Sequence, residues 1–521
     1  MGRHVLMGER PIFFYGQAYM GSLDAYLVAL FFLIFGQAVW VVRLVQTLLF
    51  MGTILTTFYL AKSIFGEVKI GLISAALMAV PVLNVTLYTT VSLGGYGEAL
   101  LLGNLILLIA ISISHDIDKH KTSNPQSQDL RFILRQTART FFVKEVILGF
   151  LIGLGLWANG LTLVYSAPAV LYLLVKALAR SGENLKNTIF LKTYFSGFGF
   201  SFLGFTVGSL PIWIFVYQSG FTRLFSEYLG SAVSVESGSW VVQVFQHLIN
   251  FFLLGIPAAF GFRPPWDVRW LVLPLIPFIL FFWIWVLLST IRIIIKKQEN
   301  WAEILLICSP MILVFCGFLG TSFGIDPSGR YFLPFSITFS LLGAVQITRK
   351  WYWSNKVGWG LVALLLFFNL GGTVQSIVNT PHGFTTQFDS TTIIDHQYDQ
   401  QLIAFLEENH ETRGYCNYWT SYPLAFLSQE NLIFVPQLPY HYDFRYTPRD
   451  DRYSPYDLVV ANSDKVAYIT VHFPALDNLL RSTFKQAGVS WKEESIGDYR
   501  VFYDLSKPIR PADINFTEKR S

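Results

Sequence analysis

The sequence predicts an all-α polytopic membrane bundle of about 10 transmembrane helices plus interfacial helices, followed by a small C-terminal α/β domain. Three observations predict it. Of the 521 residues, 53% are hydrophobic and only 14% are charged, whereas soluble proteins contain about 25% charged residues. Apolar runs of the about 20 residues that a bilayer crossing needs recur as far as residue 378. From Thr380 onward those runs stop, and charged and turn residues take over.

Residues 1–37 are predicted to be an extracytoplasmic and interfacial segment that leads into the bundle. The stretch Pro11–Gly36 begins with aromatic residues and glycines, contains one carboxylate at Asp24, and then runs apolar from Ala25 to Phe35. That apolar run is too short to span a bilayer and suits a helix lying at the membrane interface. An amphipathic anchor or a packed core helix is the plainer alternative.

The transmembrane domain, residues 38–379, is read from long apolar runs between charged breaks. The expected spans are 38–62, 69–90, 96–114, 142–158, 160–180, 192–217, 270–295, 302–323, 331–348 and 357–378. The polar loop 115–140 is expected to be solvated, with a short amphipathic helix near residues 130–140. The three cysteines show neither a disulfide framework nor the spacing of metal ligands.

Basic residues predict the orientation of the bundle. Lys and Arg gather in alternate loops, at 119–144, 176–192 and 292–297, while the loops between them carry almost none. The positive-inside rule makes the basic loops cytoplasmic. If the apolar run 240–262 also crossed, the 292–297 cluster would lie outside, so we expect that run to lie along the outer face. The protein is therefore expected in the plasma (inner) membrane as a multi-pass protein, with residues 380–521 extracytoplasmic.

Residues 380–521 are predicted to form a small α/β domain. A helix is expected at 399–409, where apolar residues have helical spacing. Short runs rich in strand-forming residues and bounded by turn residues predict the strands. These strands are expected at 431–436, 458–461, 466–471 and 499–504, with a second helix at 476–487.

Two ionisable residues stand at the outer mouths of expected spans. Arg330 lies in the sequence Gly-Arg-Tyr-Phe-Leu-Pro, and an arginine fork beside apolar surface suits phosphate oxygens. A snorkelling arginine is the structural alternative, and Asp326 can pair with Arg330 or cap the helix start. Glu98 begins a span within a Tyr-Gly-Glu sequence, where an ionisable group is a functional candidate. A glutamate favoured by the helix macrodipole explains that position equally well.

The order of elements is similar to one family. A short interfacial helix, a Phe-Gly break at 35–36, a spanning helix with an early arginine at Arg43 and a Phe-Gly turn at 65–66 resemble the integral-membrane glycosyltransferases of the GT-C type. The resemblance is to the dolichyl- or polyprenyl-phosphate-sugar transferases related to protein mannosyltransferases and the aminoarabinose transferase. The Arg-Tyr-Phe-Leu-Pro segment at 330–334 is similar to the family's Arg-Tyr-Leu-Leu-Pro. Glu98 stands near the place where aminoarabinose-type transferases have an acidic residue.

The resemblance implies transfer of a sugar from a polyprenyl-phosphate carrier to a lipid, glycan or protein acceptor on the outer face, with inversion at the anomeric carbon. Such chemistry needs a carboxylate base, cations that hold the leaving phosphate, and an apolar groove for the prenyl chain. The implied catalytic residues are Asp24 and Glu98, and the implied substrate-binding residues are Arg330, Tyr331, Tyr96 and Tyr19. The implied partners are that donor, the acceptor and membrane lipids. No nucleic acid is expected, and no cofactor is assigned, with a divalent metal left open.

The sequence departs from the family pattern at its start. The family carries an acidic pair in its first outer loop, after a first spanning helix and before a Gly-x-x-Pro segment that is Gly8–Pro11 here. This chain begins seven residues before Gly8, so that pair and that helix are missing, and we expect the chain as given to be inactive or nearly so. Asp24 is the one nearby substitute for the base. Two other classes stay open: a polyprenyl-lipid or glycan transporter, which would carry charges in mid-span, and a catalytically dead binding partner.

Overall fold

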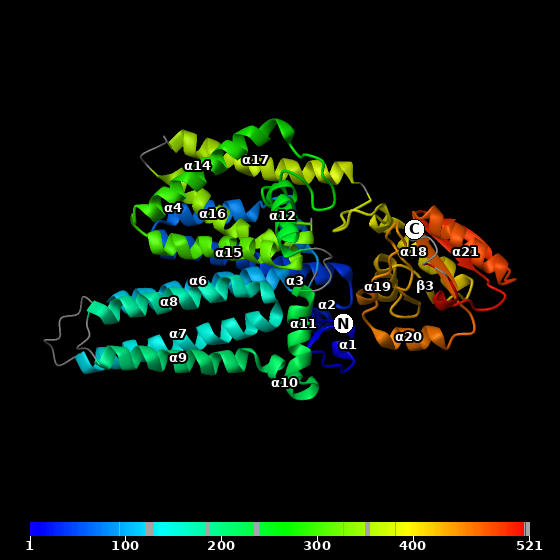
Figure 1. The fold of residues 1–521 in the computed structure, drawn as a ribbon, viewed down its shortest axis with the longest axis horizontal. Coiled ribbons are helices and arrows are strands. Elements are labelled where there is room, and N and C mark those ends of the chain that lie inside the picture. The colour runs from blue at the N-terminus through cyan, green and yellow to red at the C-terminus, as the bar shows by residue number, and fades with distance from the viewer. Residues whose placement is uncertain are drawn as a thin grey trace. The chain divides into compact units, whose positions relative to one another are not determined.

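The computed structural model describes residues 1–521 except 93, 120–129, 184–187, 234–238, 327, 350–354, 381, 515 and 517–521. The chain forms two compact units. The first contains Met1–Phe14 and Ala18–Gln375, and the second contains Tyr15–Gln17 and Ser376–Ser521. The first is a helical bundle and the second is a smaller α/β domain (Figure 1).

The first unit consists almost entirely of helices. A short hairpin, β1 (Phe13–Phe14) and β2 (Gln17–Gly21), lies between its first two helices. The helices are α1 (Gly2–Leu6), α2 (Leu23–Phe35), α3 (Val39–Phe65), α4 (Val68–Ala79), α5 (Leu83–Thr90), α6 (Tyr96–Lys119), α7 (Leu130–Ala158), α8 (Leu163–Glu183), α9 (Thr188–Gly208), α10 (Leu210–Ser219), α11 (Phe221–Val233), α12 (Trp240–Asn250), α13 (Ile256–Ala259), α14 (Ile276–Ile295), α15 (Trp301–Gly320), α16 (Leu333–Thr348) and α17 (Asn355–Asn379).

The described helices agree with the predicted number of spans. Nine are long and apolar enough to cross a membrane, or eleven if each of two bent pairs forms one span. The short apolar helix expected over 25–35 is present as α2, which begins two residues earlier, at Leu23. The prediction of a polytopic bundle with about 10 spans is therefore confirmed.

Two of the expected spans are not continuous helices. The run 69–90 is divided into α4 and α5, which meet at 74°, and the run 192–217 is divided into α9 and α10, which meet at 61°. Proline explains the first break, because Pro81 lacks an N–H and disfavours helical backbone at Val80. The Val80 carbonyl oxygen instead accepts a hydrogen bond from Asn369 Nδ2 at 2.7 Å.

The run 240–262 folds as α12, a π-helical turn and α13. Its length and hydropathy would allow a crossing. Its contacts, however, gather at one end of the bundle: His247 Nδ1 lies 3.0 Å from the Leu319 carbonyl oxygen, and Asn250 Nδ2 donates to the Gly324 carbonyl oxygen at 2.9 Å. In Figure 1, α12 runs across the direction of α15. These contacts favour a helix that lies along the end of the bundle.

Accessibility of introduced cysteines tests this orientation. We expect cysteines placed at Arg269 and at Ser390 to react with a membrane-impermeant reagent from the outer side, because the basic loops assign that side to both. The same reagent should not reach a cysteine at Lys296 in intact cells. Labelling of Arg269Cys and Ser390Cys from opposite sides would contradict the topology.

Helices α7 and α9 pack backbone against backbone along a row of glycines. A Cβ atom on Gly149 would overlap the carbonyl oxygen of Ser201, and one on Gly204 would overlap the backbone of α7. Gly153 and Gly208 continue the row in the same way. Small residues permit this close approach, which gives membrane helices dispersion contacts that lipid cannot supply. We call this contact the glycine seam.

A matched pair of substitutions on α9 tests the seam. Gly204→Ala should destabilise the bundle by about 1–3 kcal/mol, because its methyl group overlaps the α7 backbone. Gly199→Ala meets nothing within 4 Å and should stabilise the helix by about 0.5–1 kcal/mol, since alanine is the better helix former. Thermal unfolding of both variants in the same detergent measures the difference. Equal shifts in Tm would contradict close packing at Gly204.

The second unit is built on a five-stranded sheet in the order β4-β3-β5-β7-β6. Strand β3 is parallel to β4 and β5, and β7 is antiparallel to β5 and β6. The strands are β3 (Arg413–Tyr415), β4 (Ile433–Val435), β5 (Ala467–Val471), β6 (Lys492–Ile496) and β7 (Tyr499–Tyr503), and the helices are α18 (Asp399–Glu408), α19 (Tyr418–Leu427), α20 (Ser454–Ala461) and α21 (Pro474–Gln486). The prediction of a small α/β domain is therefore confirmed.

One predicted element of this unit is wrong. Residues 458–461 were expected as a strand but form the end of helix α20. Pro455 occupies the first turn, which favours a helix, and Tyr456 and Val460, four residues apart, are buried on one helical face. The sequence patterns also miss α19, β3 and β6; the last is a largely exposed strand whose polar residues give no apolar alternation.

Asp451 gives the second unit a predictable pH dependence. Burial, followed by the neighbouring Asp457, raises the pKa of Asp451 to about 7, compared with about 3.9 in an unfolded chain. A raised carboxyl pKa contributes stability that is present below the unfolded value and is lost as the pH rises through about 7.

Asp451→Asn should therefore protect the second unit at alkaline pH. Hydrogen exchange of peptides from 376–521, measured in the full chain against wild type at each pH, should slow much more at about pH 8 than at about pH 4. Asp464→Asn, at an exposed position of the same unit, is the control and should leave exchange unchanged. An equal effect of Asp451→Asn at both pH values would contradict the assignment.

Candidate active site

Asp24 is held in place by side chains from two other segments. It is the second residue of α2 and is only 1% exposed. Its Oδ1 accepts a hydrogen bond from Gln46 Nε2 at 2.6 Å, and its Oδ2 accepts one from the Ser92 hydroxyl. Ser22 occupies the N-cap position of α2. The Asp24 carboxylate is therefore bound by α3 and by the turn before α6, and it does not cap its own helix.

Glu98 is the second buried carboxyl group at this end of the bundle. It lies in the first turn of α6 and is 2% exposed. Among the residues that the structure describes, no other residue donates a hydrogen bond to either of its carboxyl oxygens. Glu98 interacts electrostatically with Asp24, and Gln46 Oε1 would lie 3.3 Å from a Cβ on Gly97. The structure thus brings both predicted catalytic residues together around Gln46.

Arg330 belongs to the short turn η5 (Arg330–Phe332) that leads into α16. Its Nε lies 2.6 Å from Asp326 Oδ2, and its Nη2 donates to the Tyr331 hydroxyl at 3.1 Å. The guanidinium carbon stands 5.0 Å from the centre of the Tyr331 ring. The side chain remains 40% exposed, so it is not simply sealed in an internal ion pair. Of the two roles that the sequence leaves open for Asp326, the structure shows pairing with Arg330.

Tyrosines surround this ion pair. The rings of Tyr88 and Tyr96 meet edge to face, with centres 5.8 Å apart. Both interact electrostatically with Arg330 and Asp326, and Tyr19 interacts with Tyr96 and Tyr331. All four predicted substrate-binding residues therefore gather in one place, which we call the arginine–tyrosine cluster (Arg330, Tyr331, Tyr96, Tyr19, Tyr88 and Asp326). Tyr96 and Glu98 share the first turn of α6, which links this cluster to the carboxyl pair.

Three site residues are missing from the sequence prediction. Gln46 lies inside a spanning helix, Ser92 lies between α5 and α6, and Tyr88 lies in the last turn of α5. A polar amide buried within an apolar span is a signal that could have identified Gln46. Tyr88 and Ser92 have no distinctive local pattern and become recognisable only through their neighbours.

Polar residues elsewhere in the first unit bond within the protein. Arg263 is 2% exposed and donates hydrogen bonds to the carbonyl oxygens of Leu254, Pro264, Pro265 and Asp267. Tyr228 donates to the Leu156 carbonyl oxygen at 3.2 Å. Arg269 pairs with Asp267 at 3.7 Å and is largely exposed. These contacts fix loops and leave Arg330 as the candidate phosphate ligand.

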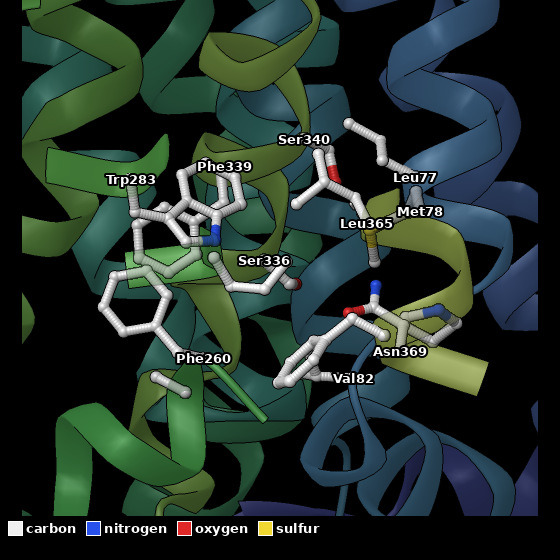
Figure 2. Close-up of a pocket in the computed structure, with 14 residues that line it drawn as sticks. Leu77, Met78, Val82, Phe260, Trp283, Ser336, Phe339, Ser340, Leu365 and Asn369 are labelled. Atoms are coloured by element: carbon white, nitrogen blue, oxygen red, sulfur yellow. Dashed lines mark hydrogen bonds between the residues drawn. The ribbon is translucent and has the colours of Figure 1, made fainter. Parts of the chain in front are cut away.

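An apolar pocket lies beside the break between α4 and α5. It is partly open and contains about 490 Å³ of space, including space at its mouth, and Figure 2 shows Trp283 and Phe339 on one wall, facing Leu365 and Asn369 across the space. Two of its polar side chains hydrogen-bond within the protein. The Ser336 hydroxyl donates to the Leu333 carbonyl oxygen at 2.7 Å, and Asn369 Nδ2 donates to the Val80 carbonyl oxygen at the same distance. The pocket therefore offers an apolar surface without a charged group.

The pocket is connected to the arginine–tyrosine cluster through Gly329. Val82 lines the pocket, and Asn84, two residues later, donates to the Gly329 carbonyl oxygen at 3.0 Å. Ser336 follows Arg330 by six residues, through η5 and the first turn of α16, a rise of about 10 Å. A headgroup at Arg330 and an apolar chain in the pocket are thus within reach of each other.

The site offers few ligands for a metal. Within the part of the chain that the structure describes, His, Cys, Asp and Glu form no group of three or more that could hold an ion. Both oxygens of Asp24 already accept hydrogen bonds from protein side chains. These residues do not fit a resident metal, and no step is assigned to one.

Comparisons with known proteins identify structural neighbours. No protein-family model and no curated protein matches the sequence. The crystal structure of ArnT from Cupriavidus metallidurans bound to undecaprenyl phosphate has a TM-score of 0.57 and 12% identity, and the match covers 98% of this chain and 93% of that chain. The apo form has a TM-score of 0.58 and 11% identity, covering 96% and 91%. An oligosaccharyltransferase from Archaeoglobus fulgidus gives 0.46 and 13%, covering 98% and 69%.

Proposed function

We propose that this chain, which has the GT-C fold of ArnT, is a membrane glycosyltransferase that moves a sugar from a polyprenyl-phosphate carrier to an acceptor on the outer face. One observation carries the proposal: the same end of the bundle holds the arginine–tyrosine cluster and the buried pair of Asp24 and Glu98. A phosphate leaving group needs the positive charge and the hydroxyl groups of the arginine–tyrosine cluster. An acceptor hydroxyl needs a carboxylate of the pair as its base. The undecaprenyl phosphate bound to ArnT supports this class of carrier.

The proposed reaction is a single displacement at the anomeric carbon. The acceptor hydroxyl oxygen forms the new bond to that carbon while Asp24 takes the hydroxyl proton. The bond from the anomeric carbon to the phosphate oxygen breaks, and its electron pair leaves with the phosphate. Arg330 and the hydroxyls of Tyr331 and Tyr96 hold the charge that develops there. A single displacement without a covalent enzyme intermediate inverts the anomeric configuration.

The apolar pocket supports a lipid-linked donor. Its wall of Phe260, Trp283 and Phe339 has ring centres 4.7–5.8 Å apart, which offers broad contact to a hydrocarbon chain. The nearby Arg330 supplies the charge that a phosphate on that chain requires. A transporter is less well supported, because the two functional groups meet at one end of the bundle.

Reconstitution of the full chain tests the proposal in two steps. Binding of undecaprenyl phosphate, measured by native mass spectrometry, should be saturable and weakened by Arg330→Ala. Undecaprenyl-phosphate-linked sugars are then supplied with total membrane lipid as acceptor, and sugar-modified lipid is sought by mass spectrometry. Binding that is indifferent to Arg330 would contradict the phosphate site, and transport of carrier across vesicles without any transfer would favour the transporter.

The side of the membrane is part of the same proposal. We place the site on the outer face of the plasma (inner) membrane, with residues 380–521 extracytoplasmic, because Lys and Arg gather in the alternate loops, which the positive-inside rule makes cytoplasmic. The reconstituted transfer assay also identifies the sugar and the acceptor, which can be a lipid, a glycan or a protein.

A further inference from the structure

Gln46 and Ser92 hydrogen-bond to Asp24, one of the two carboxyl groups of the site. Each donates one hydrogen bond to a different oxygen of Asp24. Gln46 is 2% exposed within the spanning helix α3, where an amide without a hydrogen-bond partner would be strongly destabilising. Its place is therefore fixed by the bond to Asp24. Two donors on two oxygens stabilise the ionised form of a carboxyl group.

The surroundings of the Glu98 carboxyl group differ from those of Asp24. It is as deeply buried as Asp24, yet neither of its oxygens accepts a hydrogen bond from another described residue. A buried charge without donors or a cation is strongly disfavoured, and the nearby Asp24 charge disfavours it further. Two carboxyl groups whose surroundings differ in this way divide the roles of acid and base between them.

We propose that Gln46 and Ser92 are positioning residues that keep Asp24 ionised and leave the proton of the carboxyl pair on Glu98. Asp24 is then ready to take the proton of an acceptor hydroxyl, and Glu98 is a neutral hydrogen-bond donor beside it. The inference rests on the proposed function only for the use of Asp24 as a base. The division of charge itself can be measured without any transfer reaction.

Dicyclohexylcarbodiimide, an apolar reagent, distinguishes the two states. The O–H of a protonated carboxyl group adds across a C=N bond of the reagent, and the O-acylisourea so formed rearranges to a stable N-acylurea that retains all atoms. The full chain in detergent is treated near neutral pH and its peptides are analysed by mass spectrometry. We expect Glu98 to be labelled on the order of tenfold more than Asp24, since an ionised carboxylate lacks the proton that starts the addition.

Variants of the donors test the positioning role. Gln46→Leu and Ser92→Ala should each raise the labelling of Asp24, because the proton becomes shared between the two carboxyl groups. Ser92→Thr retains a hydroxyl and should restore the wild-type pattern. Thr47→Val is the matched control on α3: Thr47 is exposed and its hydroxyl donates within its own helix, to the Arg43 carbonyl oxygen at 2.8 Å.

Infrared spectroscopy provides an independent readout. The carbonyl stretch of a protonated carboxyl group should disappear in Glu98→Gln and persist in Asp24→Asn. Preferential labelling of Asp24, a stretch that follows Asp24, or no change in either readout for Gln46→Leu would overturn the inference. The expected labelling pattern in a protein that transfers no sugar would leave this inference standing and would count against the proposed function. If transfer is active, Gln46→Leu should also shift the acidic limb of its pH–rate profile upward.

Discussion

Replacing Arg330 by alanine should lower sugar transfer by about 10²–10³-fold, the loss typical of removing one preorganised donor from developing negative charge. Arg330 contacts Asp326 and Tyr331 while its side chain stays partly exposed. Its guanidinium can therefore bind a phosphate in addition to these two residues. Arg330→Lys should give an intermediate loss, because an ammonium keeps the charge but cannot form the planar bidentate fork. The measurement is kcat/KM with a polyprenyl-phosphate sugar.

Arg269→Ala is the matched control for this series. Arg269 is also an arginine paired with an aspartate, but its side chain is 60% exposed. It should retain wild-type transfer. Equal losses in Arg330→Ala and Arg269→Ala would point to general loop disruption, and wild-type kinetics in Arg330→Ala would remove Arg330 from the phosphate site.

Asp24→Asn should abolish most of the transfer that the chain supports, by about 10²–10⁴-fold, the range that a general base contributes. Asparagine retains the shape and can still accept a hydrogen bond from Ser92, so the fold should persist. Glu67→Gln, an exposed position in the turn before α4, is the control for removing a charge. Glu98→Gln should also depress turnover, since it perturbs the neutral partner of the same pair.

The same assay tests the role of Asp24 as the base. Robust transfer by the chain as given, abolished by Asp24→Asn, would establish Asp24 as the base. Robust transfer unaffected by Asp24→Asn would place the active site elsewhere.

The sequence predicts the bundle and its terminal domain because hydropathy is a property of each local window. Spans need about 20 apolar residues, and charge breaks mark their ends. The same method overlooks the break at Pro81, since a proline within an apolar run changes direction without changing hydropathy. It also misreads 458–461, where Val459 and Val460, which have strand preference, lie at the end of a helix whose burial pattern only the folded domain reveals.

The candidate site was predictable only in part for a related reason. Arg330 and Glu98 stand out because ionisable residues at helix mouths are rare, and the structure brings both to one end of the bundle. Gln46, Ser92 and Tyr88 act through neighbours that lie 22 to 242 positions away in the chain, namely Asp24 and Arg330. Pairings of that kind are set by helix packing, which a single sequence does not display.

The glycine seam also has a mechanical consequence. Helices α7 and α9 contact each other through their main chains, so neither can slide or rotate against the other without steric collision. The two helices must therefore move as one rigid body. Any widening of the bundle to admit a bulky molecule has to occur along its other contacts, where flexible side chains separate the helices. Adding methyl groups to the seam would therefore force α7 and α9 apart. Cross-linking α7 to α9, in contrast, would leave every opening motion of the bundle intact.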